Sequence, residues 1–112
     1  MSTMRASHLL IKHSGSRNPV SRRTNESTAT VTPSAAAAEL TAIASTINKD
    51  NFAKMSFDRS DCGSFKQGGD LGEFGPGAMM KPFEDAVLAL NVGEISGLVE
   101  TDSGTHLIMR TA

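Results

Sequence analysis

The chain has 112 residues, a formal net charge of −1 and a single cysteine, Cys62. This length accommodates one compact domain, residues 1–112, with a hydrophobic core, and the lone cysteine excludes an internal disulfide. The sequence has no Trp and no Tyr, so its composition excludes the basic, aromatic-rich pattern that is typical of nucleic-acid binders. We find no secretory signal in residues 1–13 and no apolar run of the roughly 18 residues that span a bilayer. We therefore expect a monomeric cytoplasmic and nuclear protein that binds neither nucleic acid nor membranes.

The charge is unevenly distributed along the chain. Four basic residues and one acid fall within a short segment near the N-terminus: Lys12, Arg17, Arg22, Arg23 and Glu26. The rest of the chain is mildly acidic. A local basic patch on such a body indicates one small anionic ligand.

The first predicted element is a strand over residues 4–12, where side chains alternate between two faces. Both faces carry apolar residues, which predicts a central strand that is covered on both sides. Residues 13–32 are polar and without period, so they form a loop. A loop of this length in a compact domain is usually functional or disordered, and its arginines favour a functional loop.

Helices are predicted in the next part of the chain. Thr32 followed by Pro33 is a typical helix start, and Leu40, Ile43 and Ile47 recur at helical spacing. A short second helix is expected over 51–57. Glycines punctuate residues 60–79, which predicts a loop with a brief strand over 71–74.

The C-terminal third predicts a helix and a hairpin. Pro82 begins the helix, with acids in its first turn, and Asn91 and Gly93 mark its end. Strands are expected over 94–100 and 105–111, joined by a turn in which Gly104 supplies a positive φ. A strand, helices and a closing hairpin predict an α+β domain with a mainly antiparallel sheet.

Two histidines and the cysteine are the candidates for chemistry. His8 and His106 lie in predicted strands, where each can fix the tautomer of the other or simply be a hydrogen-bonded core residue. A Cys62–His106 nucleophile is an alternative, but the carboxylate of the adjacent Asp61 raises rather than lowers a thiol pKa. Metal ligands often come in pairs at short spacing. The candidate ligands lack such spacing, so no metal site is predicted from His8, His106, Cys62 and Asp61.

Binding residues are suggested by charge and by hydrophobicity. Lys12 and Arg17 flank a Ser/Gly turn and can clamp a phosphate, although a solvated loop is the alternative. Leu71, Met79 and Phe83 can line a small apolar pocket, and the alternative is that they belong to the core.

Several stretches together resemble parvulin-type peptidyl-prolyl cis/trans isomerases, in particular the branch directed to phosphorylated Ser/Thr-Pro sequences. The resemblance runs almost end to end and keeps the order of the motifs. It is carried by RASHLLIKHSGSR at 5–17, SDC at 60–62, GGDLGEF at 68–74, KPFEDAVLALNVGEISG at 81–97 and TDSGTHLIMRT at 101–111. It implies a four-stranded antiparallel sheet surrounded by about three to four helices, and no cofactor.

The resemblance also implies functions for individual residues. The family's active-site histidines, cysteine and neighbouring hydroxyls correspond to His8, His106, Cys62, Ser103 and Thr101. The wall of its proline pocket corresponds to Leu71, Met79 and Phe83, and two of its phosphate-binding residues correspond to Lys12 and Arg17.

The sequence departs from the family pattern in three ways. Asn18 stands where this branch usually has a second arginine, which Arg22 or Arg23 can replace by folding back. Met80 replaces a common glutamine. Many relatives carry an N-terminal WW module, which is not expected here because the chain has no Trp and few residues precede the first strand.

The resemblance implies isomerisation of phosphorylated Ser/Thr-Pro bonds in partner proteins. Resonance gives the amide a rotational barrier of about 18–20 kcal/mol, which an enzyme lowers by binding the twisted amide better than either planar form. The alternatives are a general parvulin without phosphate preference, a non-catalytic phosphopeptide-binding module and a chaperone-like holdase.

Overall fold

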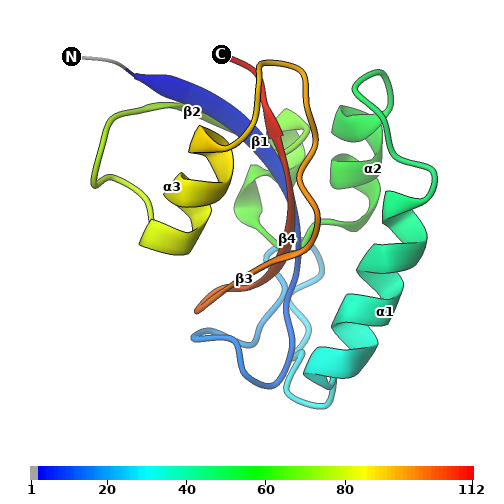
Figure 1. Cartoon of the computed structure of the whole chain (residues 1–112). Helices are drawn as coiled ribbons and strands as arrows, with labels where there is room; N and C mark the ends of the chain where they lie inside the picture. The colour runs from blue at the N-terminus through cyan, green and yellow to red at the C-terminus, as the bar shows by residue number, and fades with distance from the viewer. Residues whose placement is uncertain (1–2) are drawn as a thin grey trace.

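The computed structural model describes residues 3–112, and four strands in them form one antiparallel sheet of order β2-β1-β4-β3 (Figure 1). The strands are β1 (Met4–Ile11), β2 (Asp70–Phe74), β3 (Val99–Thr101) and β4 (Gly104–Arg110). The helices are α1 (Pro33–Ala44), α2 (Phe52–Arg59) and α3 (Lys81–Leu88), with a short 3-10 helix, η1 (Gly63–Gln67). The predicted α+β class, with its four-stranded antiparallel sheet and three to four helices, is confirmed.

The strand β1 is central and is covered on both faces, as its two apolar faces predict. Figure 1 shows α3 on one side of the sheet and α1 and α2 on the other. Each side has its own hydrophobic cluster. The cluster under α3 consists of Met4, Ala6, Phe74, Phe83, Val87 and Ile108. The cluster under α1 and α2 consists of Leu9, Ile11, Ala36, Leu40, Phe52 and Leu107.

The helix starts follow the local sequence. The hydroxyl of Thr32 accepts a hydrogen bond from the backbone N–H of Ala35 at 3.0 Å, which caps α1. Pro33 occupies the first turn, where its missing N–H costs nothing. None of the helices in residues 3–112 is long and apolar enough to cross a membrane.

Two of the predicted elements differ from the structure. Residues 63–67, predicted as loop, form the 3-10 helix η1. The strand predicted over 94–100 is regular only over 99–101, and Ile95 makes an isolated bridge to Met109. The cause lies at Ser96, because its hydroxyl, rather than a backbone carbonyl, accepts the N–H of Ile108 at 3.0 Å and interrupts the ladder.

The polar loop 13–32 contains no helix and no regular strand, as predicted, and it folds back on itself. Val20 and Ser27 form an isolated antiparallel bridge, and the N–H of Ser21 donates to the carbonyl of Glu26 at 2.9 Å. Asn25 adopts the left-handed conformation that this reversal needs, with φ 61°. The fold thereby returns Arg22 and Arg23 toward the body of the domain.

Candidate active site

The antiparallel pairing of β1 with β4 brings the two strand histidines together. Leu10 lies opposite His106 and His8 lies opposite Ile108, so the two imidazoles are diagonal neighbours on the α3 face. Their Nδ1 atoms are 2.9 Å apart, and the rings stack with centroids 5.0 Å apart. One ring therefore donates an N–H hydrogen bond to the other.

Burial keeps both histidines neutral near pH 7. Loss of solvation lowers the pKa of His8 to about 4. The same cause, followed by the charge of His8, lowers the pKa of His106 to about 3. The hydrogen-bond chain continues beyond the pair, because His106 Nε2 lies 2.7 Å from Thr101 Oγ1, which also accepts the N–H of Ser103 at 3.1 Å. His8 Nε2, at the other end, is buried without a hydrogen-bond partner among the described residues.

An aromatic ring closes over the histidine pair. Phe83, from α3, stands edge-on to His8 and His106, with ring centroids 5.6 and 5.4 Å away. Leu71 and Met79 are partly buried and pack against the same hydrophobic cluster. The three residues predicted for the proline pocket therefore belong to the same hydrophobic cluster, in which Phe83 contacts the histidine rings.

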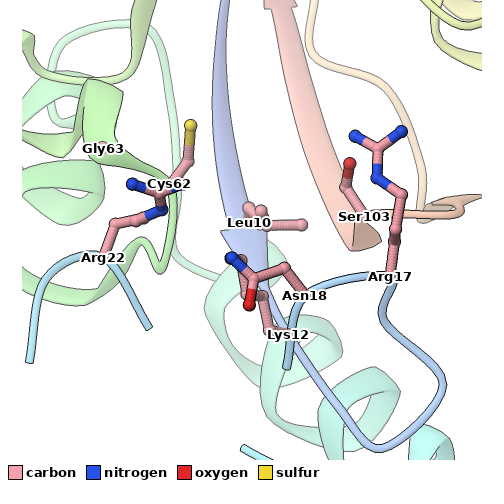
Figure 2. Close-up of a pocket in the computed structure, with 8 residues that line it drawn as sticks. All are labelled: Leu10, Lys12, Arg17, Asn18, Arg22, Cys62, Gly63 and Ser103. Atoms are coloured by element: carbon pink, nitrogen blue, oxygen red, sulfur yellow. The ribbon is translucent and has the colours of Figure 1, made fainter. Parts of the chain in front are cut away.

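Cys62 lies at a cavity of about 310 Å³, shown in Figure 2. The cavity is lined by Leu10, Lys12, Arg17, Asn18, Arg22, Cys62, Gly63 and Ser103. The hydroxyl of Ser64 donates to the sulfur of Cys62 at 3.2 Å. The alternative of a Cys62–His106 nucleophile does not fit this arrangement, because both ring nitrogens of His106 are occupied, by His8 and by Thr101.

Lys12 and Arg17 reach this cavity from different supports. Lys12 is a buried residue, and its ammonium donates to the carbonyl of Val20 at 2.8 Å. Burial lowers its pKa, and the positive charges of Arg22 and Arg17 lower it further. The backbone N–H of Arg17 donates to the carbonyl of Asp102 at 2.6 Å, which holds it at the β3–β4 turn beside Ser103 (Figure 2).

Asp61 organises the basic loop, a role that the sequence did not predict. Its buried carboxylate accepts the N–H of Lys12 at 3.0 Å, the hydroxyl of Ser21 at 2.7 Å and a guanidinium N–H of Arg59 at 3.1 Å. Its carbonyl accepts the N–H of Arg22 at 2.9 Å. These partners come from the residue after β1, the loop and α2, so no spacing within one segment predicts this contact.

A second cavity of about 660 Å³ lies beyond the β3–β4 turn. Met80, the residue that departs from the family pattern, lines it together with His13 and Glu100. The ring of His13 pairs with the carboxylate of Glu100 at 2.9 Å, and its Nδ1 accepts the N–H of Gly15. Leu71, Met79 and Phe83 line neither cavity.

Comparison with known proteins identifies the family. A family model described as "Rotamase: PPIC-type PPIASE domain" matches residues 8–112. The chain is 50% identical to "Peptidyl-prolyl cis-trans isomerase Pin1" of Arabidopsis thaliana, over 97% of this chain and 95% of that protein. It is 43% identical to "Peptidyl-prolyl cis-trans isomerase ESS1" of Saccharomyces cerevisiae, over 96% of this chain and 64% of that protein.

Solved structures agree with the sequence matches. The solution structure of TbPIN1 is 56% identical, with a TM-score of 0.88 and complete coverage of both chains. The isomerase ESS1 from Candida albicans has a TM-score of 0.90 at 36% identity, over 98% of this chain and 63% of that chain. The resemblance seen in the sequence is thereby confirmed. The chain belongs to the PPIC-type, or parvulin, family of peptidyl-prolyl cis/trans isomerases, among relatives named Pin1 and ESS1.

Proposed function

We propose that this isomerase acts on peptide bonds between a phosphorylated Ser or Thr and proline. The observation that carries the proposal is the cavity in Figure 2, where Lys12 and Arg17 gather beside Cys62 and Ser103. Within residues 3–112, Arg17 has no ion-pair partner and Lys12 pairs with no carboxylate. Cations without an ion-pair partner at the edge of a small cavity suit a phosphate dianion.

The proposed substrate pose has two anchors. The phosphate binds Lys12 and Arg17, and the proline ring packs against Leu71, Met79 and Phe83. Because the two sides of the X–Pro bond are then held separately, the carbonyl between them rotates while both ends stay bound. The enzyme accelerates isomerisation to the extent that these contacts favour the twisted amide over both planar forms.

The histidines, Cys62, Thr101 and Ser103 surround the rotating carbonyl in this pose. The twisted amide lacks resonance and is less polar than the planar one, so a dry, neutral environment favours it. Two neutral histidines provide such an environment without adding charge. No covalent step is needed, and the thiol of Cys62 pairs with Ser64 rather than with a base.

We propose phosphorylated Ser/Thr-Pro proteins as the partners, met by a monomer in the cytoplasm and nucleus. The residues of the proposed site lie within one copy of the chain, so the proposed pose requires no second subunit. The single cysteine, Cys62, supports a reducing compartment.

Exchange NMR on a pSer-Pro peptide and its unphosphorylated twin tests the proposal. We expect the enzyme to accelerate exchange in the phosphopeptide and to act much more weakly on the twin. The double variant Lys12→Ala/Arg17→Ala should reduce the phosphate preference by more than tenfold, because each charge-assisted hydrogen bond contributes about 1.5–3 kcal/mol.

The other outcomes identify the alternatives. Equal acceleration of both peptides by the unmodified protein would show a general parvulin. Binding of the phosphopeptide without any exchange would show a recognition module. An unchanged preference in the folded double variant would place the phosphate elsewhere.

A further inference from the structure

We propose that Arg22 is the third cation of the phosphate site and takes the place of the arginine that Asn18 does not supply. This inference rests on the proposed phosphate preference and deepens it. It determines which anion the site prefers, because three cations favour a phosphate dianion over a singly charged carboxylate. The sequence offered Arg22 and Arg23 equally, and the structure separates them.

Arg22 and Arg23 differ in their position relative to the cavity. Arg22 lines the same cavity as Lys12, Arg17 and Cys62, whereas Arg23 does not line it. Figure 2 shows Arg17 beside Ser103 and Arg22 beside Cys62, with Asn18 drawn between them. The two guanidinium groups therefore approach the cavity from different sides.

Hydrogen bonds to Asp61 fix the backbone around Arg22. Its N–H donates to the carbonyl of Asp61 at 2.9 Å, and the preceding Ser21 donates its hydroxyl to the carboxylate of Asp61 at 2.7 Å. Asp61 is itself held by β1, because its N–H donates to the carbonyl of Leu10 at 2.7 Å. The backbone of Arg22 is thus held on the same scaffold as Cys62, so ligand binding has to order only its side chain.

Within the described part of the chain, Arg22 also differs from other arginines in that its charge is not paired with a carboxylate. Arg5 and Arg59 pair with carboxylates, but within residues 3–112 Arg22 forms no ion pair. The charge of Arg22 is nevertheless felt at Lys12, where it depresses the ammonium pKa, after burial and ahead of Arg17. The like charges of Arg22 and Lys12 repel one another, the nearby Asp61 carboxylate offsets part of that repulsion, and a bound dianion reduces it further.

Arg23 provides a matched control in the adjacent position. It is half-buried, its Nε is buried without a hydrogen-bond partner among the described residues, and it lies outside the cavity lining. Removing Arg23 deletes the same charge from the same loop. A loss that is specific to Arg22 therefore reflects position rather than the net charge of the loop.

The experiment measures kcat/KM on a pSer-Pro peptide and on its unphosphorylated twin for four proteins: the unmodified chain, Arg22→Ala, Arg23→Ala and Arg22→Ala/Asn18→Arg. We expect Arg22→Ala to lose about tenfold on the phosphopeptide, the size of one charge-assisted hydrogen bond. Its activity on the twin should fall less than its activity on the phosphopeptide, so that the ratio of the two kcat/KM values decreases. Arg23→Ala should keep the phosphate preference, and Asn18→Arg should restore much of what Arg22→Ala loses.

The outcomes separate this inference from the function on which it rests. If the unmodified protein shows no phosphate preference, the proposed function fails and Arg22 fails with it. If that preference exists and depends on Lys12 and Arg17, but Arg22→Ala retains it, only the assignment of Arg22 is overturned. Equal losses in Arg22→Ala and Arg23→Ala also overturn it, because they indicate a general effect of loop charge.

Discussion

The buried histidine pair makes the stability of the domain depend on pH. His8 and His106 have pKa values of about 4 and about 3 in the folded protein, below the 6.5 of an unperturbed histidine. Between those values the unfolded chain binds protons that the folded chain does not. Stability from this source is therefore complete above about pH 6.5 and falls as the pH decreases, by about 1.4 kcal/mol per pH unit for each histidine.

Urea unfolding at pH 7.5, 6 and 5 measures this dependence, and we expect the free energy of unfolding to decrease in that order. The imidazole resonances of His8 and His106 should keep their neutral positions down to pH 5. A midpoint near pH 6.5 for either ring in the folded protein would contradict the argument.

At the residue scale, the sequence singled out individual side chains but not the contacts that hold them in place. His8 and His106 stood out because histidines in strands are conspicuous, and Lys12 and Arg17 because they flank a turn. Asp61 could not be predicted as the organiser of the loop, since its carboxylate joins Lys12 and Ser21, which are 49 and 40 positions away in the chain. Such contacts depend on tertiary packing, which local patterns do not encode.

At the scale of elements, the close approach of β2 to β1 depends on one glycine. Gly69 has φ +87°, and a Cβ at this position would lie 2.3 Å from the carbonyl oxygen of His8. Its own carbonyl accepts the N–H of His8 at 2.9 Å. Gly69→Ala therefore adds a clash and backbone strain, and we expect it to lower the free energy of unfolding by about 1–3 kcal/mol.

Because the clash is with His8, Gly69→Ala should also lower kcat/KM on the phosphopeptide. Gly75→Ala is the control, since a Cβ there has no neighbour within 4 Å and its φ is not positive. Chemical denaturation and exchange NMR on both variants provide the comparison. Equal stability of the two variants would show that Gly69 is not needed for the strand contact.

Elements with local signals were predicted well. The capping hydroxyl of Thr32 and the ring of Pro33 define the start of α1, and Gly104 has the positive φ, 141°, expected at the end of the hairpin turn. The 3-10 helix over 63–67 was missed because the glycines around it indicate a loop equally well. The shortened β3 was missed because the hydrogen bond between Ser96 and Ile108 forms only when the strands meet.

At the scale of the whole molecule, the sheet separates two hydrophobic clusters, and only the one under α3 contacts the histidine pair. Phe83 is almost fully buried in that cluster, against His8 and His106. Phe52 is fully buried in the other cluster, under α1 and α2. The two residues thus have similar burial, but they lie on opposite faces of the sheet, and Phe83 is the one that contacts the histidines.

The similar burial of Phe83 and Phe52 allows a matched test of which face of the sheet carries the active site. Phe83→Leu and Phe52→Leu each remove part of a buried ring, so we expect each to lower the free energy of unfolding by about 1–3 kcal/mol. Only Phe83→Leu should also lower kcat/KM on the pSer-Pro peptide, because Phe52 touches the opposite face of the sheet. Urea unfolding and exchange NMR at a temperature where both variants are folded measure the two effects. A loss of activity in Phe52→Leu equal to that in Phe83→Leu would mean that stability, rather than contact with the substrate, limits turnover. That result would contradict the proposal that the proline ring binds on the face under α3.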